Sequence, residues 1–117
     1  KTPNANPRVS GALEKHYSPD AKVWVLNANE LFVVPVQQKT LCVGWSDAFL
    51  AQADALREKH GKVVVEALSY NPSEVAKALY ATLRQADELA CKQVLFEKPE
   101  ESAEWEAVND RLKRASA

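Results

Sequence analysis

Val63-Val64-Val65 opens the part of the sequence that decides the fold, Asn71-Pro72-Ser73-Glu74 lies in its middle and Val94-Leu95-Phe96 closes it. The two ends are short apolar runs of residues that favour strands. In the middle segment the asparagine can cap a helix, the proline suits the first helical position and the glutamate stands three residues after the cap. The stretch is therefore predicted to be a strand, a helix and a second strand.

Two similar apolar runs lie upstream, at Val23-Trp24-Val25-Leu26 and at Leu41-Cys42-Val43-Gly44-Trp45. All four runs are continuously apolar rather than alternating. Continuous runs are typical of strands buried on both faces, as in a parallel sheet. The sequence thus predicts four parallel strands.

Segments with helical periodicity separate these runs. Ser46 is predicted to cap a helix that ends at Gly61, and Ser102 to start the last helix. Residues 28–39 are predicted to hold only a short helix, because Pro35 prevents a long one. The apolar stripes of the three longer helices are Phe49, Ala53 and Leu56; Val75, Leu79, Leu83 and Ala86; and Trp105, Val108 and Leu112.

Strands and helices therefore alternate from residue 22 onward. This order predicts a three-layer α/β/α Rossmann-like domain over residues 22–117, with a mainly parallel sheet of four or five strands. Residues 1–21 contain Pro3, Pro7 and Pro19 and have no lasting helical or strand period. They are predicted to be a linker or arm.

Composition restricts the classes of function. The formal net charge is −1, from 15 basic and 16 acidic residues, so no global positive field supports nucleic-acid or membrane binding. The longest apolar run, Leu31–Val36, is far shorter than the roughly 20 residues of a membrane span. Cys42 and Cys91 lie in apolar segments without metal-ligand spacing, which indicates buried free thiols and a cytoplasmic location.

The chain contains no methionine and begins with lysine, so we expect it to be a fragment of a longer protein. Its three glycines, Gly11, Gly44 and Gly61, are too far apart for a phosphate-binding loop. The sequence offers neither a catalytic triad nor paired carboxylates on an apolar face, and His60 suits a helix C-terminus. No catalytic residue and no metal ligand are therefore predicted.

A ligand site in a parallel sheet is expected beyond the carboxyl ends of the strands. Ser46, Ser69 and Asn71 occupy such positions and are candidates for binding a small anion at helix N-termini. The alternative interpretation is that Ser46 and Asn71 are simply caps. Three tryptophans are interpreted as core residues rather than as a base-stacking platform: Trp24, Trp45 and Trp105.

The arm contains His16-Tyr17-Ser18-Pro19, which a flexible spacer does not need. Exposed aromatic and imidazole groups are expected to dock on a surface, and Pro19 partly fixes the docked geometry. That surface belongs either to this domain or to a missing partner domain.

This segment resembles the linker of the long-form threonylcarbamoyl-AMP synthases, the two-domain branch of the YrdC-like family. That linker carries Ser-Pro-Gly and then His-Tyr-Ala/Ser-Pro; here Ser10 stands where the family usually has the proline before Gly11. Residues 78–87 are similar to the family's Leu-Tyr/Phe-x-x-Leu-Arg-x-x-Asp helix. Residues 107–115 are similar to its closing Ala-x-x-Asn/Asp-Arg-Leu-x-Arg-Ala helix.

The resemblance implies a cytoplasmic enzyme that converts L-threonine, bicarbonate and ATP into threonylcarbamoyl-AMP and pyrophosphate, for threonylcarbamoyladenosine formation in tRNA. ATP and magnesium would bind an N-terminal catalytic domain of the same polypeptide. This chain would be the linker plus the accessory C-terminal domain, without a cofactor of its own and only indirectly connected to tRNA. His16 and Tyr17 would contact the catalytic pocket as part of a lid.

Two other classes of function compete with this interpretation. The first is a stand-alone Rossmann-like module that binds a nucleotide or small anion through Ser46, Ser69 and Asn71. The second is a protein-interaction domain. Neither requires the arm to reach another domain, so the role of the arm separates them from the lid hypothesis.

Overall fold

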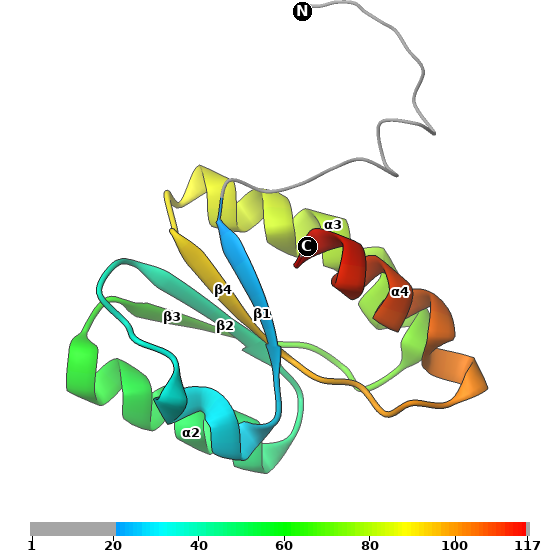
Figure 1. Ribbon diagram of the computed structural model, residues 1–117, viewed down its shortest axis with the longest axis horizontal. Helices are drawn as coiled ribbons and strands as arrows, with labels where there is room; N and C mark the ends of the chain where they lie inside the picture. The colour runs from blue at the N-terminus through cyan, green and yellow to red at the C-terminus, as the bar shows by residue number, and fades with distance from the viewer. Residues whose placement is uncertain (1–20, 117) are drawn as a thin grey trace, which may run out of the picture.

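A computed structural model of the chain describes residues 21–116. At its centre is a sheet in which every pair of neighbouring strands is parallel (Figure 1). The strands lie in the order β1-β4-β2-β3. Their bounds are β1 (Lys22–Leu26), β2 (Thr40–Gly44), β3 (Val63–Ala67) and β4 (Gln93–Glu97). The predicted parallel sheet is confirmed and has four strands.

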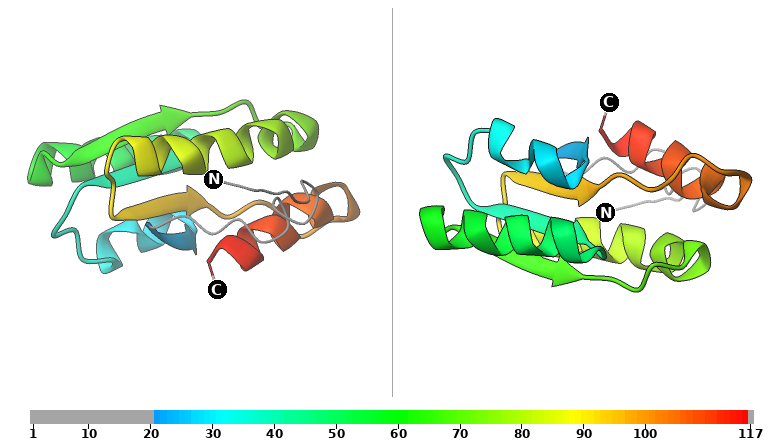
Figure 2. Two further views of the ribbon diagram at one scale, coloured as in Figure 1. Left: turned by 90° about the horizontal axis from the view of Figure 1, so that it is seen from above. Right: turned by 90° about the horizontal axis from the view of Figure 1, so that it is seen from below.

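Helices cover both faces of the sheet, so the predicted three-layer α/β/α architecture is also confirmed. One face carries the 3-10 helix η1 (Ala28–Val33) and α2 (Asp47–His60). The other carries α3 (Pro72–Glu88) and α4 (Glu106–Ala115). Seen from above, α3 lies in front of the sheet, and seen from below, α2 does (Figure 2).

The α3 and α4 face holds the larger of the two apolar clusters. The predicted stripes of both helices point into it and are buried. Leu83, for example, is fully buried, and complete burial of a leucine contributes about 1.5–3 kcal/mol. The periodicity of these helices was therefore sufficient to identify their packed faces.

The opposite face has a smaller cluster because η1 is short. The predicted α2 stripe of Phe49, Ala53 and Leu56 is buried there, together with Leu31 of η1. Phe32 and Val33 of η1 remain 47% and 78% exposed.

The helix ends lie where the sequence predicts them, except at the start of the last helix. Gly61 ends α2 in the left-handed conformation with φ 73°, as predicted. The predicted short helix after β1 is present as η1, and the Asn27 N–H donates to Glu30 Oε1 over 2.7 Å. The last helix begins as a 3-10 turn, η2 (Ala103–Trp105), and Ser102 does not cap it.

Candidate functional site

The carboxyl ends of parallel strands meet at one edge of the sheet, here called the carboxyl edge. At this edge the last residue of β4, Glu97, reaches across to the end of the neighbouring strand β2. Its Oε1 accepts hydrogen bonds from the Trp45 N–H at 2.8 Å and the Ser46 N–H at 3.0 Å. Its Oε2 accepts a hydrogen bond from Ser46 Oγ at 2.6 Å. One carboxylate thus ties the two central strands together.

This carboxylate occupies the position that an anionic ligand would take at the start of α2. The N-terminus of a helix attracts anions because its first N–H groups lack helical partners. Glu97 is only 8% exposed, and its charge-assisted hydrogen bonds compensate for its removal from water. Ser46 Oγ also accepts from the Phe49 N–H at 3.1 Å, so Ser46 is the cap of α2 as well as a partner of Glu97.

Gly44 makes this close approach possible. A Cβ atom on Gly44 would lie 2.7 Å from Glu97 Oε1 and closer still to the Phe49 ring. Both neighbours are buried. Glycine is therefore required here for space.

The other two predicted ligand-binding residues lie at the same edge, in the loop after β3. Asn71 Oδ1 accepts hydrogen bonds from the Ser73 N–H at 3.0 Å and the Glu74 N–H at 3.1 Å, which makes Asn71 the cap of α3. Ser69 is exposed, and its backbone oxygen accepts from the Asn71 N–H. The capping alternative for Ser46 and Asn71 is present in the structure. Their role in binding an anion stays a prediction.

Three stacked aromatic rings cover the carboxyl edge on the α4 side. The ring of Tyr70 lies 5.1 Å from that of Trp45 and 4.6 Å from that of Trp105. Trp105 is buried, as predicted. Trp45 lies beyond β2 and is only partly buried, and Tyr70 is 47% exposed. The interpretation of Trp45 as a strand residue is therefore wrong, because β2 ends at Gly44.

The Tyr70 hydroxyl donates to Glu100 Oε1 over 2.7 Å. Partial removal from water and this hydrogen bond both raise the pKa of Tyr70. The same hydrogen bond lowers the pKa of Glu100, because it stabilises the carboxylate. The aromatic contact of Tyr70 was not predicted from the sequence, although its place in the loop after β3, between Ser69 and Asn71, was a usable signal.

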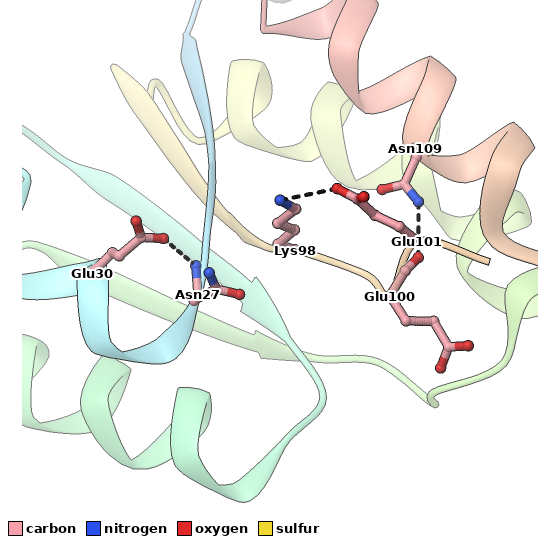
Figure 3. Close-up of polar contacts among 6 residues, drawn as sticks. All are labelled: Asn27, Glu30, Lys98, Glu100, Glu101 and Asn109. Carbon is pink, nitrogen blue, oxygen red and sulfur yellow. Dashed lines mark hydrogen bonds and ion pairs between the residues drawn. The ribbon is translucent and has the colours of Figure 1, made fainter.

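The loop after β4 is held in place by further polar contacts (Figure 3). Lys98 Nζ lies 3.2 Å from Glu101 Oε2, and Asn109 of α4 donates to the backbone oxygen of Glu100 over 3.0 Å. A recess of about 480 Å³ lies between this loop and α4. Its lining is acidic and includes Glu101, Ser102, Ala103, Glu106 and Asn109.

The opposite edge, where the strands begin, is here called the amino edge. Gln93, the first residue of β4, is fixed there by hydrogen bonds. Its Oε1 accepts from the Trp24 indole at 3.1 Å, and its Nε2 donates to the Pro35 backbone oxygen at 2.8 Å and to Thr40 Oγ1 at 3.1 Å. These contacts form the floor of a second recess, of about 240 Å³.

The predicted free thiols are present. Cys42 and Cys91 are both buried and unpaired by a disulfide. Burial raises the pKa of Cys42 to about 12 and also raises that of Cys91. Both are therefore protonated and poorly nucleophilic near neutral pH.

Within residues 21–116, no cluster of three or more His, Cys, Asp or Glu side chains could hold a metal ion. No helix in that part of the chain has both the length and the apolar character needed to cross a membrane. His16 and Tyr17, the predicted lid residues, lie outside the described residues.

Comparison with known proteins gives one match. A family model described as threonylcarbamoyl-AMP synthase, C-terminal domain, matches residues 1–117. No curated protein and no solved structure matches the chain. The match includes the arm with His16 and Tyr17 as well as the α/β domain.

Proposed function

The chain belongs to the family of threonylcarbamoyl-AMP synthase C-terminal domains, and from that premise we propose that it is the accessory, regulatory domain of an L-threonylcarbamoyladenylate synthase. The proposed enzyme converts L-threonine, bicarbonate and ATP into threonylcarbamoyl-AMP and pyrophosphate for tRNA modification. ATP and magnesium are assigned to an N-terminal catalytic domain of the same polypeptide. Residues 21–116 contain no cluster of three or more His, Cys, Asp or Glu side chains that could hold the metal.

The observation that supports an accessory role is the contact between Glu97 and the start of α2. In a nucleotide-binding sheet, the N–H groups at such a helix start would face a phosphate. Here the N–H groups of Trp45 and Ser46 donate to the chain's own carboxylate. A phosphate at the same place would have to displace a buried, hydrogen-bonded anion. The contact at the carboxyl edge thus supports a structural role, in which Glu97 joins β4 to the start of α2.

The linker, residues 1–21, is proposed to act as a lid on the catalytic domain through His16 and Tyr17. A carbamoyl-adenylate is a reactive mixed anhydride, so the pocket that forms it must exclude water and later open. The tyrosine ring can cover apolar surface while its hydroxyl reaches a polar group of the substrate. The imidazole can add a hydrogen bond whose strength changes near neutral pH.

Replacement of the lid tyrosine tests this proposal. In the polypeptide that includes the catalytic domain, Tyr17→Ala is expected to lower the yield of threonylcarbamoyl-AMP by roughly tenfold or more, equivalent to at least ~1.4 kcal/mol. Tyr17→Phe, which keeps the ring, is the matched control and should retain more activity. The melting temperature of residues 1–117 should be nearly unchanged by either substitution.

Full activity of the Tyr17→Ala enzyme would contradict the lid role. Marked destabilisation of residues 1–117 by the same substitution would show that the arm packs on its own domain instead. Pyrophosphate release by residues 1–117 alone, in proportion to protein, would contradict the accessory role.

A further inference from the structure

A lysine stands at the start of every strand of the sheet. Lys22 is the first residue of β1, and Lys39, Lys62 and Lys92 directly precede β2, β3 and β4. Backbone hydrogen bonds join these residues across the sheet. The Lys22 N–H donates to the Lys92 oxygen, the Lys92 N–H to the Lys39 oxygen, and the N–H of Thr40 to the Lys62 oxygen. The four lysines therefore form a row in the order Lys22, Lys92, Lys39, Lys62, here called the lysine row.

Strand spacing sets the dimensions of this row. Neighbouring strands lie about 4.8 Å apart, so four residues across the sheet span roughly 14 Å. All four lysines are exposed, and within residues 21–116 none of them forms an ion pair. Lys22 Nζ instead lies 5.0 Å from the centre of the Trp24 ring.

The helix ends that meet this edge carry charges of both signs. The last turn of α2 adds Lys59 and His60, and its Arg57 is already paired with Asp54. Two exposed acids, Glu58 and Glu88, lie near the ends of α2 and α3. Within residues 21–116 no ion pair joins these acids to the lysine row, so in that part of the chain the lysine side chains are unpaired.

A recess adjoins the first two lysines of the row. It is the recess of about 240 Å³ at the amino edge, and it combines an aromatic ring, amide side chains and two ammonium groups. The indole of Trp24 is held in place by its hydrogen bond to Gln93. Exposed Gln37 and Gln38 offer amide donors and acceptors. Its lining residues are Lys22, Trp24, Pro35, Gln37, Gln38, Lys92 and Gln93.

We propose that the amino edge binds a single-stranded segment of RNA, with phosphates along the lysine row and one base in the recess beside Trp24. Single strands are bound where a basic groove follows the backbone and an aromatic ring stacks on a base. Lys22 Nζ lies over the Trp24 ring, so a base that stacks there takes the place of this ammonium, which then faces a phosphate. A membrane surface would be bound by the lysines alone, without a recess of the size of a base that is lined with amide groups, so the recess favours a nucleic acid. The inference rests on the amino edge alone and does not depend on the lid role of the arm.

Fluorescence anisotropy of a labelled, mixed-sequence 12-nucleotide RNA with residues 1–117 tests the inference. The logarithm of the affinity should fall with the logarithm of salt concentration with a slope of about −3, as expected for four phosphate contacts in a single strand. Lys92→Glu should lower the affinity at least tenfold. Lys77→Glu makes the same charge change at an exposed position of α3 and should lower it less than twofold.

Competition separates the sources of phosphate. Unlabelled RNA of the same sequence should displace the probe at lower concentration than its duplex form or phosphatidylserine vesicles do. Preference for vesicles or for duplex would overturn the inference. Equal losses in Lys92→Glu and Lys77→Glu would also overturn it, because they would reflect overall charge only, and so would the absence of binding at low salt.

Discussion

At the carboxyl edge of the sheet Glu97, Glu100 and Lys98 have partners within the chain, whereas at the amino edge the four lysines of the row are exposed. Glu97 accepts three hydrogen bonds, Glu100 accepts one from Tyr70, and Lys98 pairs with Glu101. The lysine row has no ion-pair partner within residues 21–116.

The difference shows that a net charge of −1 can hide two edges of opposite character. A net charge close to zero excludes a strong positive field over the whole protein, but it does not exclude a local row of like charges. The general rule for parallel sheets correctly draws attention to the carboxyl edge. In this domain the protein's own carboxylate already occupies that edge, and the lysine row lies at the opposite one.

The largest expected effect comes from breaking the carboxyl edge at its centre. Glu97→Ala would leave the partly buried N–H groups of Trp45 and Ser46 without their acceptor, and a buried group without a partner costs about 1–3 kcal/mol. We expect the free energy of unfolding to fall by about 3 kcal/mol in urea denaturation. Glu97→Gln keeps an acceptor and should cost less. The control, Glu101→Ala, removes only an exposed ion pair and should cost below ~1 kcal/mol.

Equal losses for Glu97→Ala and Glu101→Ala would show that Glu97 does not join β2 to β4. The buried carboxylate would then contribute no more to stability than an exposed ion pair does.

A smaller effect is expected from a pair of glycines, one at each edge. Gly44→Ala places a Cβ atom against Glu97 and Phe49, and overpacking of this kind costs about 1–3 kcal/mol. Gly61 leads into β3 at the amino edge with open space around it, so only its φ of 73° restricts substitution. Gly61→Asn, which tolerates that φ, should be close to neutral. Thermal unfolding of the two variants measures the difference, and a stable Gly44→Ala variant would contradict the tight packing.

The smallest effect concerns the exposed pair Tyr70 and Glu100. The Tyr70 hydroxyl lowers the pKa of Glu100 from its ordinary value of 4.5. At pH values above 4.5 the ionised carboxylate of Glu100 therefore stabilises the folded state. This contribution is lost as the pH falls from 4.5 through the lower pKa of the folded protein. In Tyr70→Phe the stacked ring remains, and an NMR titration should show the pKa of Glu100 returning towards its ordinary value. An unchanged pKa would show that Tyr70 is not its partner in solution.

Local patterns were sufficient to predict the elements of the fold. The run Val63-Val64-Val65 lies in β3, and Asn71 and Gly61 act at helix ends as their residue types suggest. These features depend on neighbours within a few residues in sequence. The start of the last helix differed because Ser102 lies before a 3-10 turn rather than before a regular first turn.

The order of the strands could not be predicted, and it is the order that builds both edges. The contact of Glu97 with the start of α2 was not predicted, because its partners lie 51 and 52 residues away in sequence. The four lysines were visible in the sequence, each at the start of an apolar run. Parallel strands bring all four to one edge, and the order β1-β4-β2-β3 decides which lysines are neighbours.

The most direct measurement of the contrast between the edges is an NMR titration of residues 1–117 with the 12-nucleotide single-stranded RNA. We predict that the amide signals of Lys22, Lys39, Lys62 and Lys92 and the indole signal of Trp24 shift together, while those of Ser46 and Asn71 stay in place. Shifts concentrated at Ser46 and Asn71 would contradict the account, since they would mean that an anion displaces Glu97 and that the carboxyl edge is the binding surface.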